Sequence, residues 1–539
     1  MTSAPQPRPR ETSAPAPDRK PEPAPQVGGT YSNYLLGVLV LVMVMNFLDR
    51  QIITILAEDI KADLGVSDAQ IGFLYGTAFA VFYAIFGIPL GRLADVWTRR
   101  SLISIGLAFW SLMTALSGFA RGFGSLAAAR IGVGVGEASA SPAAYSMLSD
   151  SFPPRRRATV LAIYSSGIYL GGGLGLMIGG QVVGRWNAAF PDGTAPFGLV
   201  GWQAAYLVVG IPGLLLALWV STLREPVRGA ADGIVTHAEP HPWRAFFREL
   251  RAVVPPFTLW HLVREGASGR AIAFNLLLAL ALVAFSYAMV RLTGNLPQWV
   301  ALPVGIYAAL SWVTAIRMRD PACANLLFRT PTLRHVALGF SLLAFTGYGI
   351  AGWVPVFFRR VLQQPPGEVG TYIGVTAAVA GVLGITLGGL LADRLRGSRP
   401  EGRLYVGLAG ALLPIPVAWW MLTTPSVTTA YVLNFPLSVF ASMWIGIGAS
   451  TVQDLVLPRM RAVASAFYIL VITFIGFALG PYCIGELSDG LGDLAAAMRY
   501  SLAVNLVSAV LLWRALYTLP RDEATLLARA RAAGEPGLG

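Results

Sequence analysis

The chain has 539 residues, of which 55% are hydrophobic and only 13% are charged, and its mean hydropathy is +0.61. This composition excludes a soluble globular protein, which needs more polar surface, and indicates a polytopic membrane protein. The net charge of +12 does not indicate a nucleic-acid partner, because the basic residues gather in short loops on one predicted side of the membrane.

Residues 1–30 are rich in Pro, Ser and Ala and are predicted to form a disordered cytoplasmic tail. Apolar runs of about 20 residues, the length that crosses a bilayer as a helix, then predict an N-terminal six-helix bundle over residues 31–223 and a C-terminal six-helix bundle over residues 333–518. The runs lie near 34–57, 70–92, 101–120, 124–148, 157–183, 200–223, 333–358, 369–392, 403–422, 428–452, 461–484 and 497–517. Residues 519–539 are predicted to be a second cytoplasmic tail.

The linker between the bundles, residues 224–332, contains two further apolar runs at 271–290 and 299–316. Each is apolar around its whole circumference, whereas a helix that lies on the membrane surface needs a polar face. Spanning helices are therefore favoured over interfacial ones. We expect an all-α membrane protein with fourteen spans: two bundles in parallel repeat and two extra central helices.

Arginines give the expected orientation, because loops rich in Lys and Arg face the cytoplasm. One end of the predicted bundles carries Arg92, Arg99, Arg100, Arg155, Arg156, Arg157, Arg394, Arg396, Arg399, Arg403, Arg459 and Arg461; the exceptions at the other end are Arg121, Arg359 and Arg360. The arginine-rich end is predicted to be cytoplasmic, with both termini on that side. Lysine occurs only at Lys20 and Lys61, a bias typical of GC-rich bacterial genomes, so we expect a bacterial inner membrane protein.

Two loops at the arginine-rich end occur twice. Gly91-Arg-Leu-Ala-Asp95 is repeated as Gly389-Leu-Leu-Ala-Asp393, and the segment 150–164 aligns without a gap on 454–468. Parallel duplicated halves are typical of transporters that bind substrate between the halves. A carboxylate at such a turn can lie against a helix N-terminus and lock one conformation, whereas the alternative is a solvated loop charge. The predicted switch residues are Gly91, Asp95, Arg99, Arg100, Asp150, Arg157, Gly389, Asp393, Asp454 and Arg461.

Four ionisable residues lie inside predicted spans of the first bundle, where charge is costly and points to function. Asp49 and Arg50 interrupt the first span, while Arg130 and Glu137 share one face of the fourth span at heights about 10 Å apart. Arg130 is expected at the depth of Asp49, where the two groups can pair.

The second bundle lacks these charges, because the repeat offset maps them onto Gly347, Tyr348, Asn434 and Ala441. A structural device of the fold should recur in both halves, whereas a proton or substrate switch needs only one. Apolar surroundings favour the protonated form of Glu137 and an adjacent arginine favours the ionised form. A change of arginine partner can therefore load and release a proton. The alternative is an ion pair that only holds the bundle together.

Glycines in the fifth and eleventh spans are spaced for close helix contact or for bending. Pro481 can kink its helix and is predicted to be a hinge. The predicted hinge residues are Gly171, Gly175, Gly179, Gly476, Gly480 and Pro481.

No enzyme site, metal site or cofactor is predicted. The histidines have no ligand spacing or cysteine partners, and the two cysteines indicate neither a disulfide framework nor a metal site. The glycines of 132–136 lie inside a span, without the Lys-Ser/Thr of a phosphate loop. The residues considered are His237, His241, His261, His335, Cys323 and Cys483.

Gly91-x-Leu-Ala-Asp95 followed by Arg99-Arg100 resembles the loop between helices 2 and 3 of the major facilitator superfamily. Asn46-Phe-Leu-Asp-Arg50 together with Arg130-Ile-Gly-Val-Gly-Val-Gly-Glu-Ala138 looks like the spinster family. This resemblance implies alternating access around a midplane cavity, with Asp49, Arg50, Arg130 and Glu137 associated with proton coupling. In animals the family is associated with export of lysophospholipids and sphingosine phosphate. Leu176 replaces the proline of the superfamily's antiporter motif, and two central helices exceed the usual twelve.

These observations predict a monomeric, proton-coupled secondary transporter whose substrate is an amphiphilic anion such as a lysolipid. Arg50 or Arg130 is expected to meet its phosphate or carboxylate. Transport of small organic acids or drugs is the alternative within this class, and a non-transporting receptor or scaffold is the alternative from another class. The expected partners are the substrate, protons and membrane lipids.

Overall fold

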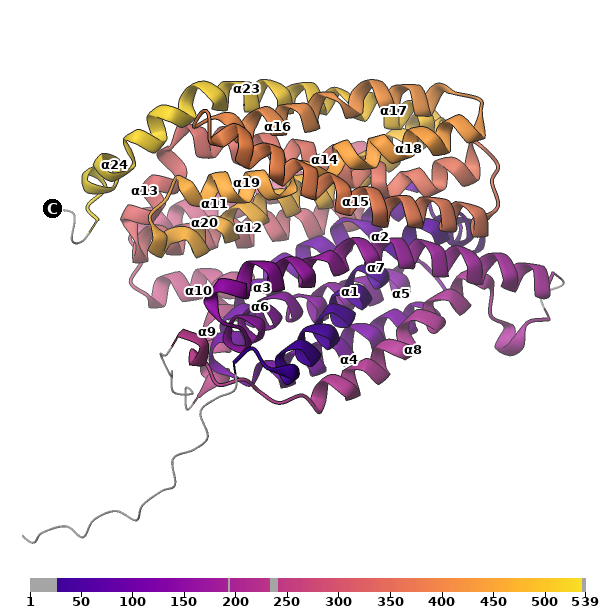
Figure 1. Ribbon diagram of the computed structural model, residues 1–539, viewed down its shortest axis with the longest axis horizontal. Coiled ribbons are helices and arrows are strands. Elements are labelled where there is room, and N and C mark those ends of the chain that lie inside the picture. Colours follow the sequence, from indigo (N-terminus) through magenta and orange to yellow (C-terminus); the bar gives the residue numbers. More distant parts are fainter. Residues whose placement is uncertain (1–26, 192–193, 233–240, 536–539) are drawn as a thin grey trace, which may run out of the picture.

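The computed structural model describes residues 27–191, 194–232 and 241–535, so the predicted tail at 1–30 lies outside the described residues up to position 26. All regular secondary structure in these ranges is helical. Figure 1 shows the two halves of the chain lying along each other, with their helices running along the long axis of the molecule.

The first half contains α1 (Thr30–Leu64), α2 (Asp68–Tyr75), α3 (Thr77–Val96), α4 (Arg99–Ser117), α5 (Phe123–Glu137), α6 (Ala140–Ser151), α7 (Pro154–Ala189) and α8 (Gly201–Ser221). The linker forms α9 (Pro242–Val253), α10 (Phe257–Arg264), α11 (Gly269–Thr293), α12 (Leu296–Arg319) and α13 (Pro321–Arg329). The second half contains α14 (Pro331–Arg360), α15 (Pro366–Arg396), α16 (Gly402–Leu412), α17 (Pro414–Thr423), α18 (Val427–Ser442), α19 (Ile445–Asp454), α20 (Arg461–Val471), the π-helix η4 (Ile472–Ala478), α21 (Leu479–Leu491), α22 (Leu494–Ser501), α23 (Ala503–Ala524) and α24 (Leu526–Ala532).

Thirteen helices in the described ranges are long and apolar enough to cross a membrane. They include α11 and α12, at the places where the sequence predicts two extra central helices. We call the end where α3 stops and α4 starts the arginine-rich end, and the end where α1 stops and α2 starts the opposite end.

The fourth predicted span is not among these thirteen helices, and it is divided into α5 and α6 by a short turn at Ala138 and Ser139. Two residues explain the break. Ser139 donates its hydroxyl to the carbonyl oxygen of Gly136 at 2.8 Å, which competes with the helical bond, and Pro142 has no N–H for the carbonyl of Ala138. The break leaves Glu137 as the last residue of α5.

The linker helices pack along the boundary between the halves. Gly305 of α12 lies so close to both halves that an added Cβ would meet Phe474 of η4 at 2.5 Å and Val81 of α3 at 2.9 Å. At the opposite end, the Trp299 ring lies 5.7 Å from the Tyr482 ring of α21. The α12 helix therefore contacts both halves of the chain.

Much of the segment predicted as a C-terminal tail is helical. Residues 519–524 continue α23, and α24 follows with Ala530 fully buried. Arg459, before α20, forms ion pairs with Asp320 of the linker and with Glu535. The end of the chain is therefore attached to the arginine-rich end of the second half, as Figure 1 shows for α24 and α13.

The attachment of this C-terminal segment should be lost only in acid. Hydrogen bonds from Arg459 lower the pKa of Asp320 and of Glu535, and a lowered pKa stabilises the folded contact above the unfolded pKa, near 4, and releases it as pH falls further. The protection factors of residues 526–535 against hydrogen exchange should thus be constant from about pH 8 to about pH 5 and fall below about pH 4. Arg459→Gln should show fast exchange already at neutral pH, and slow exchange in that variant would contradict the assignment.

Candidate transport site

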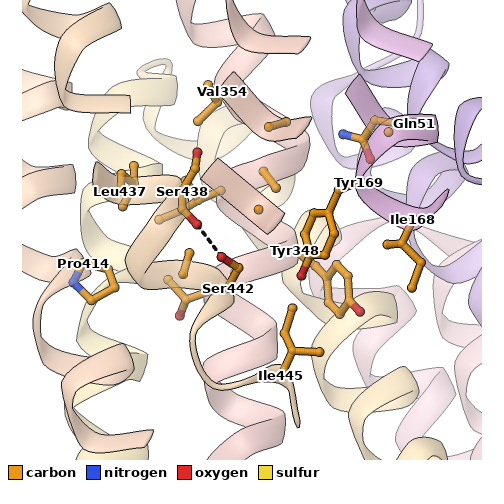
Figure 2. Close-up of a pocket in the computed structure, with 18 of the residues that line it drawn as sticks. Gln51, Ile168, Tyr169, Tyr348, Val354, Pro414, Leu437, Ser438, Ser442 and Ile445 are labelled. Carbon is orange, nitrogen blue, oxygen red and sulfur yellow. Dashed lines mark hydrogen bonds between the residues drawn. The ribbon is translucent and has the colours of Figure 1, made fainter. Parts of the chain in front are cut away.

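A cavity of about 250 Å³ lies between the two halves. The first half contributes residues of α1, α2 and α7, and α14, α15 and α18 of the second half contribute most of the remaining wall. Figure 2 shows Gln51, Ile168 and Tyr169 facing residues of the second half, among them Tyr348, Leu437 and Ser438. Most of the lining is apolar or aromatic, and Arg50 is the one charged side chain in it among the described residues.

Arg50 connects this cavity to the buried charges of the first half. Its Nη2 atom donates to Oε2 of Glu137 at 2.8 Å, with the arginine side chain 15% exposed and the glutamate fully buried. A weaker hydrogen bond joins Arg50 to Asn46 at 3.3 Å. A buried charge pair with good geometry is tolerated in an apolar interior, whereas either partner alone is costly.

Aromatic rings surround the guanidinium of Arg50. Its Cζ lies 4.2 Å from the ring centre of Phe79, 4.5 Å from that of Phe47 and 5.3 Å from that of Tyr83. Phe477 of η4 contributes a fourth ring at 5.9 Å from the second half. Faces of aromatic rings attract a cation, so the rings hold Arg50 at the cavity wall while it remains accessible.

Arg130 and Asp49 lie close together, but the predicted pairing of their charged groups is wrong for this conformation. Arg130 donates to the backbone oxygen of Asp49 at 3.1 Å and to that of Leu74 at 3.4 Å. The Asp49 carboxyl is fully buried near Trp110 and Thr114 and has no hydrogen bond of normal geometry within the described part of the chain. The helical spacing gave the correct height for both residues but not the direction of their side chains.

The hydrogen bonds that join the halves gather at the opposite end. Arg360 of α14 bonds to Glu58 and Asp68 at 2.7 Å and 2.6 Å, and Arg359 bonds to Asp59 at 2.5 Å. We call these five residues the charged clasp. Asp489 of α21 adds bonds to the N–H groups of Asp68 and Ala69 at 3.0 Å and 2.8 Å. The cavity is therefore closed toward the opposite end.

Close backbone contact strengthens the same closure. An added Cβ on Gly173 of α7 would meet the carbonyl oxygen of Gly374 at 2.4 Å, and one on Gly180 would meet that of Pro366 at 2.3 Å. The predicted hinge glycines face inward instead: Gly171, Gly175 and Gly179 pack on α1, and Gly476 and Gly480 pack on α14. They serve close helix contact within each half in this conformation.

Pro481 lies three residues after the end of η4 in the helix where the sequence predicts a hinge. The distortion of this helix is the π-helix over residues 472–478, which precedes the proline. Pro481 cannot donate to the carbonyl of Phe477, and the wider turn adjusts to this loss. The side chain of Phe477 leaves the π-helix toward Arg50.

The repeated loops form equivalent ion pairs in both halves. Arg99 pairs with Asp150, and at the repeat-related positions Arg403 pairs with Asp454 at 2.6 Å. Arg157 donates to the carbonyl of Ser149 at 3.0 Å, and Arg461 donates to that of Gln453 at 3.4 Å. Asp95 and Asp393, which follow Gly91 and Gly389, are 65% and 80% exposed, so neither is held inside the protein in this conformation.

Arg99 is held more firmly than its counterpart. It is fully buried and also donates to Glu225 at 2.8 Å, Ser146 at 2.7 Å and the carbonyl of Pro226 at 2.7 Å. Glu225 further accepts from the N–H groups of Arg99 and Arg100, at 3.2 Å and 2.9 Å.

Arg99→Gln should therefore cost about 3 kcal/mol or more of stability, because it removes a fully buried guanidinium that satisfies several partly buried acceptors at once. Arg403 is 17% exposed, so Arg403→Gln should cost about 1 kcal/mol or less. Thermal unfolding of the two variants in detergent tests this difference. Equal shifts in Tm would contradict it.

Several residues at the site were not predicted from the sequence. They are the aromatic rings around Arg50, its partner Asn46, and Glu225, which follows α8 and accepts hydrogen bonds from the first two residues of α4. One signal was present for the rings, because Phe79 and Tyr83 are four residues apart and share one face of α3. That spacing is equally typical of core packing.

Comparisons with known proteins agree with this architecture. The sequence profile described as "Major Facilitator Superfamily" matches residues 39–319, more than half of the chain. An "MFS-type efflux pump" of Mycolicibacterium smegmatis is 26% identical over 497 residues, covering 90% of this chain and 93% of that protein. "Protein spinster homolog 1" of Homo sapiens is 28% identical over 479 residues, covering 85% and 74%.

A solved structure is also similar. It is described as a bacterial homologue of the human lysosomal transporter Spinster, in an inward-facing and unoccupied conformation. It aligns with a TM-score of 0.64 at 25% identity and covers 93% of this chain and 99% of its own. The chain therefore belongs to the major facilitator superfamily and is a transporter of the spinster type.

Proposed function

We propose that this protein couples proton movement to the transport of an amphiphilic anion by alternating access. The observation that carries the proposal is the Arg50–Glu137 pair at the wall of an otherwise apolar cavity between the halves. A cation at the edge of an apolar surface matches a molecule with an anionic head and a hydrocarbon tail. Lysolipid-like molecules have this chemistry.

The pair also offers a route to coupling. Glu137 shares Arg50 with any anion that enters the cavity, because a guanidinium has a limited number of donors in one direction. An anionic substrate that takes Arg50 leaves a buried carboxylate without its cation, and protonation removes that cost. Asp49 is a second buried carboxyl in the same half, without a side-chain cation bound to it within the described residues.

The orientation follows from the arginines. Loops rich in arginine face the cytoplasm, so we place the arginine-rich end and both termini inside. The charged clasp then lies on the outer side and the structure corresponds to an inward-facing state. A bacterial inner membrane is the proposed location, and a monomer suffices because each chain contains both halves of the cavity.

Solute flux into proteoliposomes tests this function. With an imposed pH gradient, an anionic lysophospholipid should be transported faster than its zwitterionic counterpart. A small organic acid and a cationic drug serve as the alternative substrates. Flux of the drug or the acid alone would replace the amphiphilic anion as substrate, and flux of the lysolipid without a response to the gradient would remove proton coupling.

A further inference from the structure

The linker helices α9 and α10 carry an outward face that the transport cycle does not use. Both helices lie at the arginine-rich end (Figure 1), beside α3 and α12. We call the exposed residues of this face the linker surface: Trp243, Arg244, Phe247, Arg248, Arg251, Phe257, Trp260, Val263 and Arg264.

Five of the nine residues of the linker surface are large and apolar. Trp243, Phe247 and Trp260 are each 48% exposed, and Phe257 and Val263 are 54% and 57% exposed. The opposite faces of the same helices are buried at Ala245, Ala252, Val253 and Leu262. A helix face that only meets water carries few exposed apolar side chains of this size, so hydration alone does not account for the linker surface.

Arginines alternate with these apolar residues. Residues 242–270 contain five arginines and two glutamates, an excess of three positive charges. Glu249 is only 16% exposed and faces Arg248 and Arg319 at 3.9 Å and 4.0 Å. In the described residues, Arg244, Arg251 and Arg264 form no salt bridge. Their charge is therefore available to an external anion.

Two of these arginines share one ring. The Cζ atoms of Arg251 and Arg264 lie 5.5 Å and 5.0 Å from the ring centre of Trp260. The indole thus draws together two guanidiniums that would otherwise repel each other. Tryptophan at the depth of the headgroups, with arginines that extend toward phosphate, is the chemistry of the membrane interface.

We propose that the linker surface binds the anionic phospholipid headgroups of the leaflet at the arginine-rich end. Trp243, at one edge of the linker surface, also lies 5.2 Å from the ring of Trp97, the residue that follows α3. A lipid bound there therefore contacts α9 and α10. Through Trp243 and Trp97, α9 packs against the turn between Asp95 and Arg99. The ligand is the bilayer itself and not a free phosphate, because the exposed rings need an acyl region next to the anion.

The test uses the full chain in nanodiscs that mix phosphatidylcholine and phosphatidylglycerol, with the lipids retained by the protein counted by native mass spectrometry. The wild type should retain phosphatidylglycerol preferentially. Arg251→Gln with Arg264→Gln should reduce this preference at least about tenfold, since each arginine near an anionic surface contributes about fivefold. Arg394→Gln with Arg399→Gln, two exposed arginines at the same end, should leave the preference unchanged.

Three results would overturn the proposal. The first is equal retention of the two lipids by the wild type, and the second is an equal loss of preference in both double variants. The third is displacement of phosphatidylglycerol by millimolar inorganic phosphate, which would indicate a site for a free anion. Matching Tm values of the three proteins confirm that all are folded.

Discussion

Replacing Glu137 with glutamine is expected to abolish the response of transport to an imposed pH gradient. Glutamine has nearly the same shape as glutamate and can still accept the hydrogen bond of Arg50, but it cannot take up a proton in this range. For one proton per substrate, a difference of about one pH unit can sustain about tenfold accumulation. The variant should show no accumulation driven by the pH gradient, although downhill exchange of substrate continues.

The matched control is Glu486→Gln. Glu486 is also a carboxylate in a spanning helix, but it bonds to Asn295 and Tyr482 at 2.6 Å and 2.9 Å and lies outside the cavity lining. Its replacement should leave the pH response intact. Full pH-dependent transport by Glu137→Gln would end the coupling role proposed for this residue.

Arg360→Gln should shift the protein toward the conformation that is open at the opposite end. The substitution removes ion pairs to Glu58 and to Asp68, whose side chain is only 2% exposed. Hydrogen bonds to charged groups contribute about 1.5–3 kcal/mol each, so the loss of the bonds from Arg360 should change the ratio of the two conformations by at least about tenfold.

Distances between spin labels placed on the two halves at the opposite end measure this shift. The longer distance should gain population in Arg360→Gln. Arg121→Gln is the control, because Arg121 is an exposed arginine at the same end whose side chain is not part of the charged clasp. An unchanged distance distribution in Arg360→Gln would show that close helix packing alone closes this end.

The predictable part of the fold rests on local patterns. Spans follow from apolar runs, and the repeat of 91–95 at 389–393 identifies the two halves. The two spanning helices of the linker, α11 and α12, were also predicted from apolar runs. The break after Glu137 was missed, although Ser139 and Pro142 lie beside it in the sequence, because the apolar run continues through the turn without interruption.

The burial of four charged residues in the first half was predictable from the sequence, and their pairing was not. The energetic cost of burying a charge identified Asp49, Arg50, Arg130 and Glu137 as candidates. In the structure three of them are fully buried and the Arg50 side chain is 15% exposed. Which arginine meets Glu137 depends on the rotation of α1 relative to α5, and a single sequence gives only heights along each helix. The charged clasp had a sequence signal of a different kind, since Arg359 and Arg360 are exceptions to the positive-inside pattern and pair with acidic residues of the other half.

The unequal origin of the cavity wall has a consequence for how this transporter can diversify. The first half supplies Arg50, held by Glu137, whereas the second half supplies most of the residues that line the cavity. Substitutions at Leu437 or Ser438 change the shape and polarity of that lining at residues that form no contact with Arg50 or Glu137 among those described. Under the proposed function, the ion pair assigned to coupling lies in the first half and most of the cavity lining lies in the second half, so the lining can change while the ion pair is kept.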